Sequence, residues 1–181
     1  MGMAVSIPRY TIDDLDRFPD DGNRYELLDG MLLVTPAPTV AHQVVASRLH
    51  TRVALAVALP GYAHVVSPGA ISVPPGTQLQ PDILVYPARF PLDVTWQDVT
   101  EHWLAVEILS RSSRVYDREF KRDAYFALGV AEVWLVDPRT RTVEVCRRES
   151  AEAIRDVIRW TVPECSLVVP VDLSEVFAGP G

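Results

Sequence analysis

One stretch of the chain constrains its fold more than any other, residues 103–138, which read WLAVEILSRSSRVYDREFKRDAYFALGVAEVWLVDP. Two short apolar runs within it, residues 104–109 and 133–136, have the length and composition of buried strands. Between them, residues 117–128 follow a helical pattern that Gly129 can end. A strand, a helix and a strand within about thirty residues form the βαβ unit of a parallel or mixed sheet. We therefore predict an α/β fold whose sheet is covered by helices.

The predicted helix carries a lysine on the side that should face the sheet. At about 100° per residue, Phe120 and Ala124 belong to one apolar stripe, and Lys121 and Asp117 lie within or at the edge of that stripe. Lys121 could pair with Asp117 one turn away, or could reach the acid Glu107 in the preceding strand. Lys121 is also the only lysine among the 17 basic residues of the chain. A chain this rich in arginine that keeps one lysine here indicates a need for a compact ammonium group.

The composition excludes several classes of protein. A length of 181 residues with 48% hydrophobic content predicts one globular domain, residues 1–181. No apolar run reaches the roughly 18 residues of a membrane helix and no signal peptide is visible, so we expect a cytoplasmic protein without a membrane partner. Two scattered cysteines predict neither a disulfide framework nor a zinc site.

The charge is unevenly distributed. The net charge of −7 argues against a surface that coats nucleic acid broadly. Residues 111–148, however, carry nine basic and six acidic side chains, a balance of +3. This segment is either a local phosphate-facing patch or simply the solvated face of a helix and a hairpin, and charge alone does not decide between them.

Outside the βαβ unit, the pattern predicts mostly short strands. Asp29-Gly30 is a strong hairpin turn between strands at residues 25–28 and 31–35, and residues 39–59 form a long helix capped by Thr39. The run 87–101 is expected to be a loop. Further strands are expected at residues 63–66, 70–73, 83–86, 142–147 and 167–169, and short helices at residues 11–18 and 172–176. The strand at residues 142–147 should pair with that at residues 133–136.

Three acids could do chemistry together with Lys121. Asp82 precedes an apolar strand, Glu107 lies within one, and Glu26 lies in the first strand of the hairpin. Acids on neighbouring strands with a lysine from the adjoining helix can hold Mg²⁺ beside a phosphate. Each residue also has a structural interpretation: Asp82 can cap a turn, Glu26 can lie at an exposed edge, and Glu107 with Lys121 can form a structural ion pair. Spacing alone favours the structural interpretations.

A resemblance changes this balance. Tyr25-Glu26-Leu27-Leu28-Asp29-Gly30, His42-Gln43, Gln80-Pro81-Asp82, the run 106–110, and Tyr116-Asp117 through Lys121, Tyr125, Trp134 and Asp137-Pro138 occur in the order and spacing of one family. In this respect the chain resembles the Uma family of predicted restriction endonucleases, a branch of the PD-(D/E)xK nuclease superfamily. The resemblance covers about residues 10–175.

The resemblance implies a restriction-endonuclease-like α/β fold, with a central mixed sheet flanked by helices, and a catalytic set of Glu26, Asp82, Glu107 and Lys121. Asp82 and Glu107, assisted by Glu26, would bind Mg²⁺ or Mn²⁺. Leu109 occupies the position where the superfamily pattern has its lysine, so the helical Lys121 would take that role and position the attacking water.

The resemblance also implies partners and supporting residues. The substrate would be nucleic acid, expected to be DNA, and cutting both strands of a duplex favours a homodimer. Tyr125 and Asp117 would orient Lys121. His42 also matches the family pattern, but neither the sequence nor the resemblance assigns it a role.

Two alternatives remain open from the sequence. The first is a nuclease-like module that binds nucleic acid or a protein without cleaving, which the acidic net charge favours. The second is a structural or regulatory dimer whose buried charges are ion pairs. Metal binding separates the second alternative from the other two readings, because a structural ion pair gains little from Mg²⁺.

Overall fold

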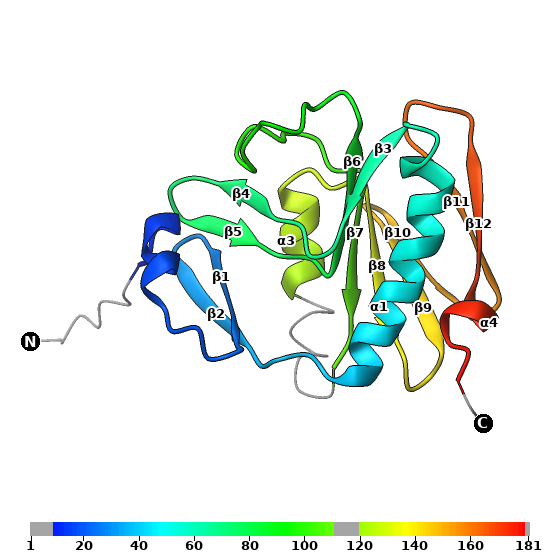
Figure 1. Cartoon of the computed structure of the whole chain (residues 1–181), viewed down its shortest axis with the longest axis horizontal. Coiled ribbons are helices and arrows are strands. Elements are labelled where there is room, and N and C mark those ends of the chain that lie inside the picture. Colours follow the sequence, from blue (N-terminus) through cyan, green and yellow to red (C-terminus); the bar gives the residue numbers. More distant parts are fainter. Residues whose placement is uncertain (1–8, 111–119, 180–181) are drawn as a thin grey trace, which may run out of the picture.

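The computed structural model describes residues 9–110 and 120–179, and its centre is a six-stranded mixed sheet (Figure 1). The strand order is β10-β9-β8-β7-β6-β3. Only the contact between β7 and β8 in this sheet is parallel, which confirms the predicted βαβ unit. The strands are β3 (Ala63–Val66), β6 (Ile83–Pro87), β7 (Leu104–Ile108), β8 (Glu132–Asp137), β9 (Thr142–Arg147) and β10 (Ser150–Ile154).

A smaller antiparallel sheet lies beside the first, with the order β2-β1-β5-β4. Its strands are β1 (Arg24–Leu28), β2 (Met31–Thr35), β4 (Ile71–Val73) and β5 (Thr77–Leu79), and the short helix η1 (Ile12–Arg17) precedes them. The hairpin of β1 and β2 turns at Asp29 and Gly30, whose φ angles are 51° and 79°. Both angles lie in the left-handed region that an Asp-Gly hairpin turn requires, so this prediction is confirmed.

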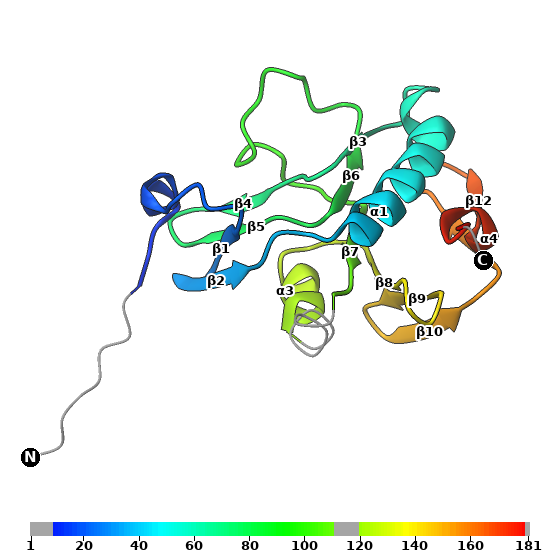
Figure 2. The same ribbon diagram turned by 60° about the horizontal axis from the view of Figure 1, so that its bottom comes forward.

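The long helix α1 (Val40–Val53) covers one face of the large sheet and continues into the π-helical turn η2 (Ala54–Ala58). Its cap is the one predicted, because the Thr39 side chain accepts a hydrogen bond from the His42 amide at 3.3 Å. The pair β11 (Val157–Thr161) and β12 (Val168–Asp172) and the short helix α4 (Leu173–Val176) lie on the same side, as Figure 2 shows.

The helix α3 (Arg122–Ala127) lies on the opposite face, on the side of the smaller sheet (Figure 2). Gly129 follows it with a φ of 85°, which confirms the predicted glycine stop. Residues 111–119 lie outside the described residues, so the predicted beginning of this helix and the proposed role of Asp117 cannot be compared with the structure.

The central strands bury side chains on both faces. In β7, Leu104, Val106 and Ile108 belong to the core beneath α1, whereas Ala105 belongs to the core on the α3 side. Alternation along a strand therefore directs Glu107 towards α3.

Within the described residues, no helix is both long and apolar enough to cross a bilayer.

Candidate active site

The structure brings together all four predicted site residues. Lys121 immediately precedes α3, Glu26 lies in β1, Glu107 in β7, and Asp82 directly precedes β6. None of the four is more than 4% exposed. Four ionisable side chains buried at one place must be paired with one another or with other polar groups.

Asp82 and Glu107 meet because of the strand register. Ile83 pairs with Val106 in the antiparallel contact of β6 and β7, so the next position along that register sets Asp82 beside Glu107. The Ile108 amide accordingly donates to Asp82 Oδ2 at 2.8 Å. The antiparallel register thus places two carboxylates side by side at one end of the neighbouring interior strands β6 and β7.

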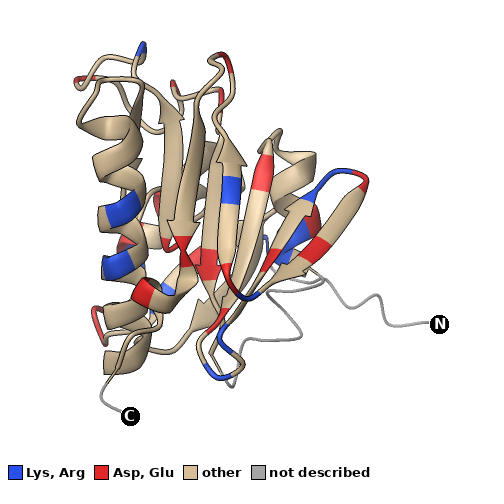
Figure 3. Ribbon diagram, turned by 90° about the vertical axis from the view of Figure 1, so that its right-hand side faces the viewer, with Lys and Arg blue, Asp and Glu red and all other residues tan. Residues whose placement is uncertain are grey.

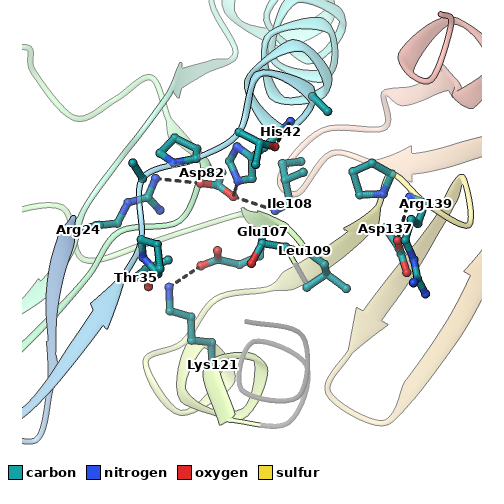
Figure 4. A pocket seen from close by; sticks show the side chains of 17 residues that line it. Arg24, Thr35, His42, Asp82, Glu107, Ile108, Leu109, Lys121, Asp137 and Arg139 are labelled. Atoms are coloured by element: carbon teal, nitrogen blue, oxygen red, sulfur yellow. Dashed lines mark hydrogen bonds and ion pairs between the residues drawn. The ribbon is translucent and has the colours of Figure 1, made fainter. Parts of the chain in front are cut away.

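Lys121 contacts two carboxylates, of which Figure 4 shows that of Glu107. Its Nζ is 2.7 Å from Glu26 Oε2 and 3.0 Å from Glu26 Oε1, and it is 3.2 Å from Glu107 Oε1. Of the two partners that the sequence left open for Lys121, the structure confirms Glu107, whereas Asp117 lies outside the described residues. One ammonium does not neutralise two carboxylates, so further donors are needed.

Those donors come from Gln80 and Tyr125. The Gln80 amide donates to Glu26 Oε1 at 2.6 Å, and the Tyr125 hydroxyl donates to Glu107 Oε1. Burial, together with the charges of Glu107 and Glu26, raises the pKa of Tyr125 well above 10. Tyr125 therefore stays a hydrogen-bond donor. It contacts the Glu107 carboxylate that Lys121 also contacts, so the predicted role of Tyr125 in orienting Lys121 would act through Glu107.

Asp82 is surrounded by donors. Arg24 Nη2 lies 3.0 Å from Asp82 Oδ1, and His42 Nε2 lies 3.0 Å from Asp82 Oδ2. Burial opposes ionisation of Asp82, but the hydrogen bond and charge of His42, then Arg24 and the Ile108 amide, outweigh it and lower its pKa. Asp82 is therefore held as a carboxylate.

Arg24 is the site residue that sequence reasoning missed. Its guanidinium donates to Asp82 and, at 2.9 Å, to the Gln80 carbonyl. Burial alone would lower the pKa of Arg24, but the carboxylates of Asp82, Glu107 and Glu26 raise it. The sequence could have indicated Arg24, because Arg24 and Glu26 are two residues apart in a predicted strand and so lie on the same face of it.

A cavity of about 480 Å³ opens onto this cluster. Asp82, Glu107, Lys121, Arg24 and His42 all line it. The segment between β2 and α1 forms one wall and the turn after β8 another, where Figure 4 shows Asp137 and Arg139. Glu26 does not line the cavity, but it contacts the Lys121 ammonium, which does.

The residues fit a hard divalent cation. Asp82 and Glu107 offer carboxylate oxygens on one cavity wall, and Mg²⁺ is commonly held by one or two carboxylates and several waters. No group of three or more His, Cys, Asp or Glu side chains among residues 9–110 and 120–179 is arranged to hold a metal ion. The role of Glu26 as a third ligand stays a prediction, and its contacts favour a role in holding Lys121.

Comparison with known proteins places the chain in a family. The sequence model of Uma2, described as "Putative restriction endonuclease", matches residues 12–174. The chain belongs to the Uma2 family. The match covers the strands and helices that carry every site residue of this Uma2 protein, and it confirms the resemblance read from the sequence.

One solved structure supports the fold of this Uma2 protein. It is the crystal structure of a "putative nuclease belonging to DUF820" from Anabaena variabilis ATCC 29413, with a TM-score of 0.72 and 20% sequence identity. The match covers 92% of this chain and 97% of that chain. The predicted restriction-endonuclease-like α/β fold is therefore confirmed. No curated protein matches the sequence of this Uma2 protein.

Proposed function

We propose that this protein is a metal-dependent nuclease that hydrolyses phosphodiester bonds in DNA. The observation that carries the proposal is the position of Lys121, an ammonium held by Glu26 and Glu107 at the wall of a cavity that Asp82 also lines. Membership of a family described as restriction endonucleases agrees with this chemistry.

Asp82 and Glu107 are the residues that would hold Mg²⁺ or Mn²⁺. A bound metal of this kind would neutralise a phosphate oxygen and lower the pKa of a water molecule. The chain supports this role by keeping Asp82 ionised, since Arg24, His42 and the Ile108 amide all donate to it. The two carboxylates also explain why burying a lysine and an arginine here is tolerable.

Lys121 would act on the reacting groups directly. Its ammonium can orient a water for attack on phosphorus and can stabilise the negative charge that develops as the P–O ester bond breaks. Glu26 and Glu107 fix its position, so little reorganisation is needed at the moment of reaction. Glu26 is on this account a positioning residue, because it contacts Lys121 and does not line the cavity.

The cavity carries cations as well as carboxylates. The charged side chains that line it are three cations, Arg24, Lys121 and Arg139, and three carboxylates, Asp82, Glu107 and Asp137, so their formal charges cancel, and a bound divalent cation would offset the buried Glu26. A phosphate would therefore meet a site that is not repulsive overall, despite the net charge of −7 of the whole chain.

We further propose that two copies act together, since one site cuts one strand.

Cleavage assays test the proposal. Supercoiled DNA, single-stranded DNA and RNA are incubated at low salt with Mg²⁺, Mn²⁺ or EDTA, because phosphate contacts weaken with salt. The variants are Asp82→Asn and Glu107→Gln, with the exposed Asp93→Asn as the matched control. We expect metal-dependent cleavage of DNA by the wild type and the control, and roughly 100-fold slower cleavage by the two site variants.

Two outcomes would contradict the proposal. Equal cleavage by all four proteins would place the activity elsewhere. Binding without cleavage by a folded wild type would favour the non-cleaving module that the sequence left open.

A further inference from the structure

Three exposed arginines lie at the end of the large sheet where the cavity opens. Arg139 and Arg141 belong to the turn between β8 and β9, and Arg155 directly follows β10. We call these three residues the arginine cluster. In Figure 3 the turn after β8 and the connection between β10 and β11 both carry blue segments, at the lower end of the view. Two separate connections of the chain therefore bring positive charge to one end of the sheet.

Hydrogen bonds join these two connections. Arg155 Nε donates to Thr142 Oγ1 at 3.2 Å, and Thr142 Oγ1 donates to the Thr140 carbonyl at 3.1 Å. The strand register agrees, because Ile154 lies opposite Val143 in the antiparallel pairing of β10 and β9. Arg155 therefore comes opposite Thr142, at the end of the turn that carries the other two arginines.

The arginine cluster is continuous with the cavity of the candidate active site. β7 and β8 are parallel, with Ile108 opposite Val136, so both strands end on the same side of the sheet. Ile108 and Arg139 both line the cavity. From β7 across β8 and β9 to β10 the sheet extends three strand spacings, about 14 Å at roughly 4.8 Å each. Since phosphates follow one another about every 3.4 Å along one strand of B-DNA, this distance corresponds to about four nucleotides.

The arginine cluster has no carboxylate partner within residues 9–110 and 120–179. None of its three guanidinium groups forms a salt bridge there, although Asp137 and Asp156 are near in the sequence. The Asp137 carboxylate accepts from amides of the turn, including that of Arg139 at 2.9 Å. The exposed Arg89, by contrast, pairs with two glutamates. The guanidinium groups of the cluster are therefore available to an anion from outside the chain.

The backbone at Arg141 supports a functional role for its side chain. Its φ angle is 52°, in the left-handed region that a residue with a Cβ atom adopts at a cost. Glycine and asparagine are the residues that such turn positions favour. An arginine at this position indicates that the guanidinium group, rather than the shape of the turn, decides the choice of residue.

We propose that the arginine cluster binds the phosphates of the nucleic acid strand next to the bond that is cleaved in the cavity. The inference rests on the proposed function for the identity of this ligand. Arginine binds phosphate oxygens through two parallel hydrogen bonds, so the cluster can orient the strand as well as attract it. A chain with a net charge of −7 thereby gains a local surface for DNA. For residues 139 and 141, this favours the phosphate-facing patch over the solvated hairpin that the sequence left open.

The salt dependence of DNA binding tests the proposal. Fluorescence anisotropy measures the binding of a labelled duplex of roughly 20 base pairs in EDTA, which prevents cleavage, between about 50 and 200 mM salt. A triple variant, Arg139→Gln with Arg141→Gln and Arg155→Gln, should bind more weakly. The slope of log K against log salt concentration should become shallower by about 2.7, since each phosphate contact contributes about 0.9.

Arg159→Gln is the matched control. Arg159 is exposed in β11, outside the cluster, and it also forms no salt bridge within the described part of the chain. This variant should keep the wild-type slope. A triple variant with the wild-type slope, or a wild type that does not bind the duplex, would overturn the proposal.

The binding result is separate from the cleavage assay. If the wild type does not cleave, a shallower slope in the triple variant still assigns DNA binding to the cluster. If the wild type cleaves and the slope is unchanged, only the cluster is refuted. In cleavage, Arg141→Gln with Arg155→Gln should raise the KM for DNA by roughly tenfold and lower kcat by less, because flanking phosphates are held both before and during the reaction. A fall in kcat with an unchanged KM would contradict this role.

Discussion

Lys121 Nζ lies 2.7 Å from Glu26 Oε2, although the two residues are 95 positions apart in the sequence. This contact joins the smaller sheet to the beginning of α3, and it is buried on both sides. The contact is therefore both a part of the proposed site and a long-range link of the fold. Its two roles can be separated by measuring stability and activity on the same variants.

Glu26→Ala should destabilise the protein by about 3–5 kcal/mol, because it leaves Lys121 buried without its closest carboxylate. Urea unfolding at pH 7 measures this change. The matched control is Glu152→Ala, which removes an exposed glutamate from the edge strand β10 and should stay within about 0.5 kcal/mol of the wild type. Adding Lys121→Met to Glu26→Ala should cost less than the sum of the single changes. Strict additivity would show that the two side chains do not interact.

Tyr125→Phe should cost about 1–3 kcal/mol, because the buried Glu107 carboxylate then loses a donor while the ring remains in the core. Cleavage should slow as well, since Glu107 would no longer be fixed beside Lys121. Urea unfolding and cleavage rates measure the two effects. A variant as stable and as active as the wild type would refute the role of this hydroxyl.

His102 should make stability depend on pH. The side chain is buried, and burial lowers its pKa from 6.5 to about 4 despite the opposing effects of the Glu101 charge and the Val99 backbone. The unfolded state therefore binds a proton more tightly than the folded state. The contribution of His102 to the free energy of unfolding is therefore fully present above pH 6.5 and is lost as the pH falls towards about 4.

Comparing His102→Leu with the wild type isolates that effect. Between pH 7 and pH 4.5, urea unfolding of the wild type should lose about 2 kcal/mol more than unfolding of the variant. An equal loss in both proteins would mean that His102 is protonated in the folded state. His102 lies outside the proposed site, so this result is independent of the nuclease.

Metal binding should stabilise the folded protein. At a concentration 100 times the dissociation constant, Mg²⁺ or Mn²⁺ should add about 2.7 kcal/mol to the free energy of unfolding of the wild type. Asp82→Asn should lose most of this gain, because one of the two carboxylates at the cavity is removed. Thermal unfolding with and without metal measures both. No shift in the wild type would favour a purely structural cluster of ion pairs.

The sequence predicted the parts of the fold that rest on strong local patterns. The parallel pairing of β7 and β8, the Asp29-Gly30 hairpin and the cap at Thr39 all follow from periodicity and turn chemistry. The strands β5, β10 and β11 were missed. β10 reads SAEAI and is largely exposed, so no alternation of apolar and polar residues marks it, and β5 has only three residues.

The site was predictable to the same extent. The helical wheel directed Lys121 inward, and the structure shows it buried between Glu26 and Glu107. The contacts of Arg24 and His42 with Asp82 could not be derived, because they join strands and a helix whose relative placement is set by the whole core. The sequence pattern predicts on which face of a helix or strand a residue lies. The residue that it contacts there depends on how the helices and strands pack together.

The most direct test of the central claim is the rate of DNA cleavage by Lys121→Ala in saturating Mg²⁺ or Mn²⁺. Lys121 should contact the reacting groups without binding the metal, so the variant should keep metal binding, measured by thermal unfolding, and lose roughly 100-fold or more in rate. Glu26→Gln, which alters the position of Lys121, should lose less. Cleavage by Lys121→Ala at the wild-type rate would contradict the proposed site.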